Sequence, residues 1–120
     1  MIKAMFLIFN FVFLNYCYAE EYKVYDKNWN YNGKFQKDDG TAKFYDKNYT
    51  YTGYSKTENG TTKYYDTNSN YLGYSKGDIT DSFAKHYDRD QEITGYTKKE
   101  GDVIKRYDKN WNLEKYYKKK

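Results

Sequence analysis

Five aspartates recur along the chain, each directly after a tyrosine, and carboxylates are well suited to binding a metal or transferring protons. They are Asp26, Asp46, Asp66, Asp88 and Asp108. In three copies the aspartate begins the pattern Asp-x-Asn-x-Asn, which is how a calcium-binding loop begins. The rest of that loop is missing, because no glycine follows and the twelfth positions hold Lys37, Gly77 and Lys119 instead of glutamate. We therefore predict that the aspartates close turns and bind no metal.

The sequence offers little for catalysis. Acid–base work by two carboxylates needs environments that separate their pKa values, and near-identical repeats supply near-identical environments. His86 is the single histidine and occupies a position that holds Val, Phe, Tyr or Arg in the other copies, so we assign it a structural role. Cys17 is the single cysteine. A His/Cys zinc site is therefore excluded, and a catalytic triad is open only through His86. We expect no enzyme and no cofactor.

Three aromatic residues stand in predicted turns, where burial is difficult: Trp29, Tyr49 and Trp111. Exposed aromatic rings can stack on sugars or enter the surface of a partner protein. We predict that these three residues are the ligand-binding residues. The expected ligand is a glycan or an envelope protein.

All of these residues recur because the chain repeats itself. The five Tyr-Asp pairs lie 20, 20, 22 and 20 residues apart, and such a period is typical of a repeat architecture. In every copy a lysine precedes the tyrosine by two positions. These lysines are Lys23, Lys43, Lys63, Lys85 and Lys105. The period of a strand places this lysine and tyrosine on one face, and the residue between them on the other face with the aspartate. The lysines either pair with acids or cover aromatic rings.

Each Tyr-Asp pair is followed by a four-residue turn and a second strand. An aspartate with asparagine or aspartate two positions later favours a tight turn. In four copies the second strand contains a glycine: Gly33, Gly53, Gly73 and Gly95. A recurring glycine inside a strand indicates a bulge or a group packed closely over the backbone. We expect the tyrosine of each Tyr-Asp pair to lie across the glycine of its own hairpin.

Short links join the copies, and Asp39-Gly40 and Asn59-Gly60 are strong hairpin signals. The link at 77–82 is two residues longer than the others and accounts for the spacing of 22. We therefore predict an all-β fold of five hairpins in a continuous antiparallel meander. No capping segments are evident, which favours closure around a pseudo-five-fold axis over an open linear solenoid. The departures from pattern, Lys34 and Lys115, fall in the first and last copies, where such a ring would join.

The N-terminal segment has a different composition from the repeats. A lysine, an apolar run from Ala4 to Leu14 and Ala19 before two glutamates are typical of a secretory signal peptide over residues 1–19. An uncleaved anchor and lipidation at Cys17 remain alternatives. The expected mature chain, residues 20–120, is a single domain without a thiol, and we expect it to be secreted or periplasmic.

Composition limits the class of partner. The net charge of +4 is small, and the basic residues are evenly mixed with acidic ones along the chain. This pattern argues against nucleic-acid binding. Aliphatic residues are scarce and tyrosine is abundant, with 18 copies. Disorder is therefore an alternative, although aromatic side chains can supply the buried area instead.

Tandem units of the form Tyr-Asp-x-x-x-x-apolar-x-Gly after a signal peptide resemble the small bacterial five-fold β-flower proteins. The resemblance covers residues 20–120 and implies a five-fold arrangement of hairpins without an assigned function. Two other repeat types are similar, namely the Tyr-Asp repeats of large secreted toxins and choline-binding repeats, but the latter require paired tryptophans that are missing here. We expect a monomeric, multivalent binding module; a purely structural envelope protein is the alternative.

Overall fold

The computed structural model describes residues 19–120, and this part of the chain folds into ten antiparallel β-strands. The strands are β1 (Glu20–Asp26), β2 (Tyr31–Asp38), β3 (Thr41–Asp46), β4 (Tyr51–Glu58), β5 (Thr61–Asp66), β6 (Tyr71–Lys76), β7 (Phe83–Asp88), β8 (Ile93–Glu100), β9 (Val103–Asp108) and β10 (Leu113–Lys119). The predicted all-β meander is confirmed. The proposed signal peptide lies outside the described residues except for Ala19.

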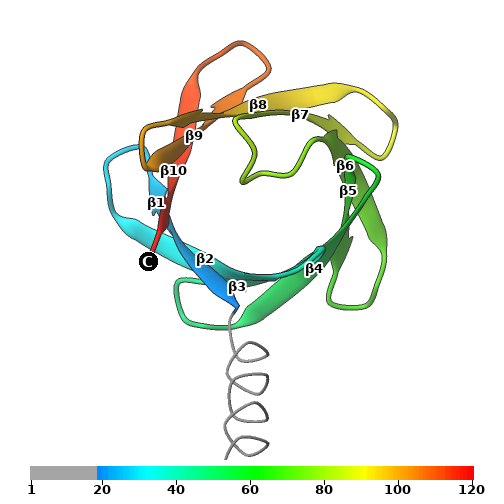
Figure 1. The fold of residues 1–120 in the computed structure, drawn as a ribbon, viewed down its shortest axis with the longest axis horizontal. Coiled ribbons are helices and arrows are strands. Elements are labelled where there is room, and N and C mark those ends of the chain that lie inside the picture. Colours follow the sequence, from blue (N-terminus) through cyan, green and yellow to red (C-terminus); the bar gives the residue numbers. More distant parts are fainter. Residues whose placement is uncertain (1–18) are drawn as a thin grey trace, which may run out of the picture.

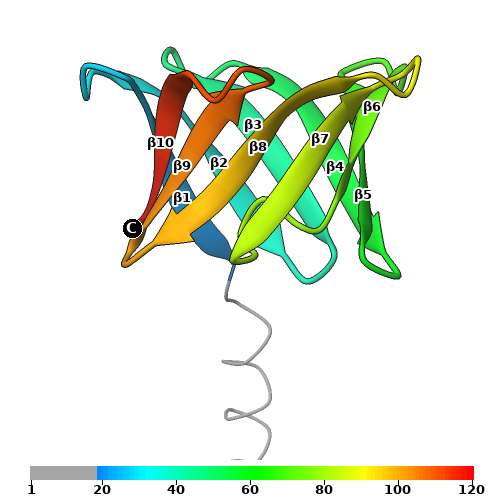
Figure 2. The ribbon, with the colours of Figure 1, turned by 90° about the horizontal axis from the view of Figure 1, so that it is seen from above.

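Each strand pairs with its neighbours in sequence, and β1 also pairs with β10, so the sheet closes into a barrel (Figure 1). The β1–β10 pairing extends from Tyr22 opposite Lys119 to Asp26 opposite Lys115. Closure leaves no strand edge free to pair with another chain. The open solenoid is therefore excluded. Figure 2 shows the strands tilted across the barrel wall, with the hairpin turns at one end and the links at the other.

The aspartates close the hairpin turns, as predicted. In all five turns the aspartate Oδ1 accepts the backbone N–H groups of the residues two and four positions later, at 2.8–3.0 Å. The third turn residue is left-handed in every copy, with φ between 63° and 68°. The hydrogen bonds to the carboxylate offset the cost of this conformation in residues other than glycine.

The glycines have a different role from the one expected. In the four hairpins that have the glycine, a bulge interrupts the pairing beside it, as in the shift at Val24/Tyr25 opposite Gly33. The tyrosine ring does not cover it, because the tyrosine faces outward while Gly33 is buried on the inner face with Phe35. A Cβ on Gly33 would instead lie 2.5 Å from the carbonyl oxygen of Tyr45, in the next hairpin. The glycine is therefore needed for close approach of neighbouring hairpin backbones.

Replacing Gly53 with alanine should destabilise the barrel by about 1–3 kcal/mol, because the new methyl group would overlap the carbonyl oxygen of Tyr65 and φ is +153°. Chemical denaturation would measure the free energy of unfolding. Gly101→Asn is the matched control, since no atom lies within 4 Å of a Cβ there and asparagine tolerates φ of +64°. Equal stability of Gly53→Ala and the parent protein would contradict this role of the glycine.

At the level of Phe35, the inside of the barrel has large side chains on one side and small ones on the other. Nearer the turns, every hairpin has a larger inward residue, such as Phe44, Tyr64 and His86. Tyr22, Phe35, Ile104 and Tyr117 form the buried cluster. The strands of the second, third and fourth hairpins contribute small residues instead: Ala42, Ser55, Thr62, Ser75, Ala84 and Thr97. This asymmetry leaves space inside the barrel beside the small residues.

The long link between β6 and β7 fills that space. Its Ile79 is 5% exposed and belongs to the buried cluster, and the ribbon of the link turns into the barrel (Figure 1). Lys37, at the end of β2, binds the link through an ion pair with Asp78 at 2.5 Å and a hydrogen bond to Thr80 at 2.7 Å. The long link at 77–82 therefore forms a plug that joins opposite walls of the barrel.

Ile79→Ala should destabilise the protein by about 2–5 kcal/mol, because it removes buried methyl groups and leaves a cavity among aromatic rings. Leu72→Ala is the control, since Leu72 is exposed and should change the free energy of unfolding by less than about 0.5 kcal/mol. Equal effects of the two substitutions in urea denaturation would show that the link does not contribute to the core.

Within residues 19–120, no helix has the length and apolar character needed to cross a membrane.

Candidate functional site

Aromatic side chains line the outer boundaries between neighbouring hairpins, which we call seams. At four of the five seams a tyrosine of one hairpin lies opposite the tyrosine of the neighbouring Tyr-Asp pair, as Tyr54 lies opposite Tyr65. At the seam between β2 and β3, Lys34 takes the place of that first tyrosine. At two seams the rings stack directly, with centroids 5.0 Å apart for Tyr54 and Tyr65 and 4.7 Å apart for Tyr74 and Tyr87. The repeat thus places a pair of outward-facing rings where two hairpins meet.

Trp29 and Trp111 fold back onto these seams. Trp29 stacks on Tyr116 of β10 at 3.9 Å and 12°, and Trp111 stacks on Tyr96 of β8 at 4.2 Å and 5°. Each indole also meets the tyrosine of its own Tyr-Asp pair at about 5.5 Å. Trp29 is 49% exposed and Trp111 is 51% exposed. Each tryptophan is therefore held in place by stacking while a large part of its surface remains open to solvent.

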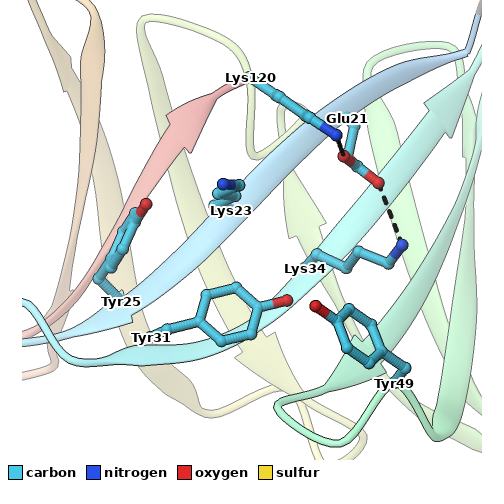
Figure 3. Close-up of a pocket in the computed structure, with 7 residues that line it drawn as sticks. All are labelled: Glu21, Lys23, Tyr25, Tyr31, Lys34, Tyr49 and Lys120. Carbon is cyan, nitrogen blue, oxygen red and sulfur yellow. Dashed lines mark hydrogen bonds and ion pairs between the residues drawn. The ribbon is translucent and has the colours of Figure 1, made fainter.

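Tyr49 is the most exposed of the three predicted ligand-binding residues, at 65%. It borders a groove of about 460 Å³ on the outer wall, shown in Figure 3. The groove is lined by Glu21, Lys23, Tyr25, Tyr31, Lys34, Tyr49 and Lys120. Figure 3 shows the hydroxyl groups of Tyr31 and Tyr49 pointing toward one another beside Lys34. This arrangement offers hydroxyl donors, ammonium groups and aromatic faces to one ligand.

Glu21 organises the cations of the groove. Its carboxylate lies 3.0 Å from Lys120 Nζ and 3.1 Å from Lys34 Nζ, and it accepts a hydrogen bond from Gln36 at 3.3 Å. Hydrogen bonds from Lys120 and then Lys34 lower the pKa of Glu21 from 4.5 to about 2. The hydrogen bond between Lys34 and Glu21 in turn raises the pKa of Lys34. Lys34 Nζ also lies 5.3 Å from the ring centroid of Tyr49, so the ammonium group joins the carboxylate to the aromatic wall.

The predicted site residues do not form one site. Tyr49 borders the groove, whereas Trp29 does not line it and only contacts Tyr25, which does. Trp111 lies on the seam between β8 and β9, with Tyr96 and Tyr107. The sequence prediction missed Glu21 and Tyr31. Lys34 was noted only as a departure from the repeat, and that departure was the available signal, because the other copies have tyrosine there.

The remaining candidates have structural surroundings. His86 is buried, and its Nε2 lies 3.1 Å from Thr97 Oγ1. Burial, followed by the charge of Arg106, lowers the pKa of His86 to about 3, so the ring is neutral at pH 7. These surroundings agree with the structural role predicted for His86. In residues 19–120 no three His, Cys, Asp or Glu side chains gather closely enough to hold a metal ion. Of the recurring lysines, Lys85 lies over Tyr87 and Lys105 pairs with Glu100.

No family model matches the sequence, and the searches of curated proteins and of solved structures found no match.

Replacing Glu21 with glutamine should lower the melting temperature at pH 7, and this difference should shrink as the pH falls from about 4.5 to about 2. A carboxylate whose pKa is lowered by folding stabilises the protein above its unfolded pKa, and this contribution is lost on protonation. Thermal unfolding at several pH values measures the difference between parent and variant. The lowered pKa values of Asp26, Asp66 and Asp108 are common to both proteins, so their contribution to the pH dependence cancels.

Glu58→Gln is the control for this experiment, because Glu58 lies at the exposed end of β4. It should unfold like the parent at every pH. A difference between parent and Glu21→Gln that is unchanged at pH 2 would show that the groove does not depend on the charge of Glu21.

Proposed function

We propose that this chain is a non-enzymatic binding module, secreted or periplasmic, whose outer wall binds a glycan or an envelope protein. The observation that carries the proposal is the geometry of Trp29, Tyr49 and Trp111, which remain about half exposed or more at the turns. Trp29 and Trp111 are already fixed by stacking, so little side-chain entropy is lost when a ligand covers them. A sugar ring can lie on such a surface while neighbouring hydroxyl and ammonium groups bind its oxygens.

The proposed mechanism is multivalent. The three aromatic residues lie on different seams, so one extended ligand or a layer of ligands can engage several weak sites at once. We also propose that the hairpins are arranged about a pseudo-five-fold axis, as in the β-flower proteins that the sequence resembles. Equivalent registers support this arrangement: Gly33, Gly53, Gly73 and Gly95 each pair with the aspartate of the following hairpin.

A purely structural envelope protein is the second candidate, and one observation favours it. Trp29 stacks on Tyr116 across the seam where the first and last hairpins meet, so the ring contributes to closing the barrel even without a ligand. The two candidates differ in what the loss of the rings changes. A binding module loses affinity at all three positions, whereas a structural protein loses stability at the two stacked positions.

Substitution by asparagine separates the two candidates, because asparagine tolerates the left-handed backbone at all three positions. We expect Trp29→Asn, Tyr49→Asn and Trp111→Asn each to weaken binding to an envelope polysaccharide by about 2- to 10-fold, as stacking contributes about 0.5–1.5 kcal/mol. Titration of tryptophan fluorescence measures binding by the parent and by Tyr49→Asn, and pull-down on the immobilised polysaccharide measures all variants.

Ser69→Asn is the matched control, since Ser69 occupies the same left-handed turn position without an aromatic ring. It should bind like the parent. Unchanged fluorescence of the parent across a broad panel of glycans and envelope extracts would overturn the binding proposal. If Trp29→Asn and Trp111→Asn are less stable than the parent, and neither the parent nor any variant binds, the result would support the structural role instead.

A further inference from the structure

Two cations lie directly opposite one another on the inner face of the barrel wall. Arg106 occupies the inward position that holds valine, phenylalanine, tyrosine or histidine in the other hairpins. Lys115 occupies the position of the recurring glycine, and the register of β9 and β10 pairs it with Arg106. Like charges at directly opposed positions destabilise a sheet. The last hairpin therefore carries a repulsion that the other four hairpins avoid.

Little in the surroundings offsets this repulsion. Glu114 lies 3.5 Å from Arg106 Nε, and it is the one ion-pair partner of Arg106 in residues 19–120. Within the same residues Lys115 makes no ion pair. Burial and the charge of Arg106 lower the pKa of Lys115, and His86 beside them is neutral. One half-exposed carboxylate thus faces two partly buried cations, an arrangement that is costly unless a further anion joins it.

A pocket of about 330 Å³ opens next to Arg106 at the turn end of the barrel. This volume lies at the lower end of the range for small-molecule sites, about 300–1,000 Å³. Its walls include Tyr64, Leu72 and the neutral His86, which present mainly apolar surface. Gly73 lies in the same wall, where its backbone approaches that of Tyr87 and Asp88.

Asp88 also lines this pocket, and its negative charge repels an anion from that side. Its Oδ1 accepts the N–H groups of Asp90 and Glu92. In three other turns an asparagine side chain also binds Oδ2, but Glu92 stands at that position here. Asp88 Oδ2 is therefore available to a hydroxyl or amine donor, and an anionic group is directed to the side of Arg106.

We propose that the turn-end pocket binds a small molecule that carries one carboxylate or phosphate group on a flat apolar body. Arg106 lines the pocket and holds the anionic group through the planar fork of its guanidinium. Lys115, opposite Arg106 in the register, does not line the pocket and contributes only the field of its positive charge. The apolar body lies against Tyr64, Leu72 and His86. This site is on the inner face of the barrel, so it is independent of the function proposed for the outer wall.

Phenyl phosphate and benzoate are the probes for this proposal, with inorganic phosphate and benzyl alcohol as controls that lack the body or the charge. We expect phenyl phosphate or benzoate to raise the melting temperature of the parent protein and to give a saturable calorimetric titration. Neither control should do so at the same concentration. No shift with either probe, or an equal shift with inorganic phosphate alone, would overturn the proposal.

Arg106→Gln and Lys115→Met assign the site to these two residues. Arg106→Gln should reduce the affinity for the probe by tenfold or more, because a charged hydrogen-bond partner is lost. Lys115→Met should reduce it by a smaller factor, because Lys115 lies opposite Arg106 but does not line the pocket. Without the probe, Lys115→Met should melt at a higher temperature than the parent, since the buried repulsion is gone; a merely structural lysine would not give this result. Lys105 lies on the outer face of β9, the strand that carries Arg106, so Lys105→Gln should bind the probe like the parent. Equal loss of affinity in Lys105→Gln would overturn the assignment.

Discussion

β1 and β10 pair from Tyr22–Lys119 to Asp26–Lys115, and this pairing converts a row of five hairpins into a closed wall. An isolated hairpin is marginal in water, so each one depends on its two neighbours, and closure gives the first and last hairpins a neighbour as well. The barrel then has an inside that can be filled by Tyr22, Phe35 and Tyr117 together with the plug residue Ile79. Trp29 stacks over the same closing seam from the outside.

The repeated features of the fold could be predicted from sequence because they depend on local chemistry. Asp66 with Asn68 and Asn70 specifies a turn, and the alternation of Lys63, Tyr64 and Tyr65 specifies the two faces of a strand. Contacts between hairpins could not be predicted in this way. The need for the glycines comes from a carbonyl oxygen of the next hairpin, and the plug depends on Lys37 from the opposite wall, 41 residues before Asp78. Neither partner is adjacent in the sequence.

The candidate sites were predictable only in part, for a related reason. Aromatic residues at turns could be recognised as exposed, and Tyr49 does border a groove. The direction in which Trp29 and Trp111 fold, however, depends on tyrosines of the neighbouring hairpins in the closed barrel. The distinctive sites occur where the repeat is broken. Lys34 replaces a tyrosine in the outer groove, Lys115 replaces a glycine inside the barrel, and the long link becomes the plug. The repeat thus builds the wall, and its exceptions differentiate the surfaces.

Amide hydrogen exchange at β1 and β10, followed by NMR on the protein comprising residues 20–120, tests the closed barrel most directly. Each N–H of β1 that points to β10 should exchange as slowly as those in β4 and β5, since all are bonded within a continuous sheet. Rapid exchange of these β1 and β10 amides, with protection kept from β2 to β9, would show an open row of hairpins and contradict the account.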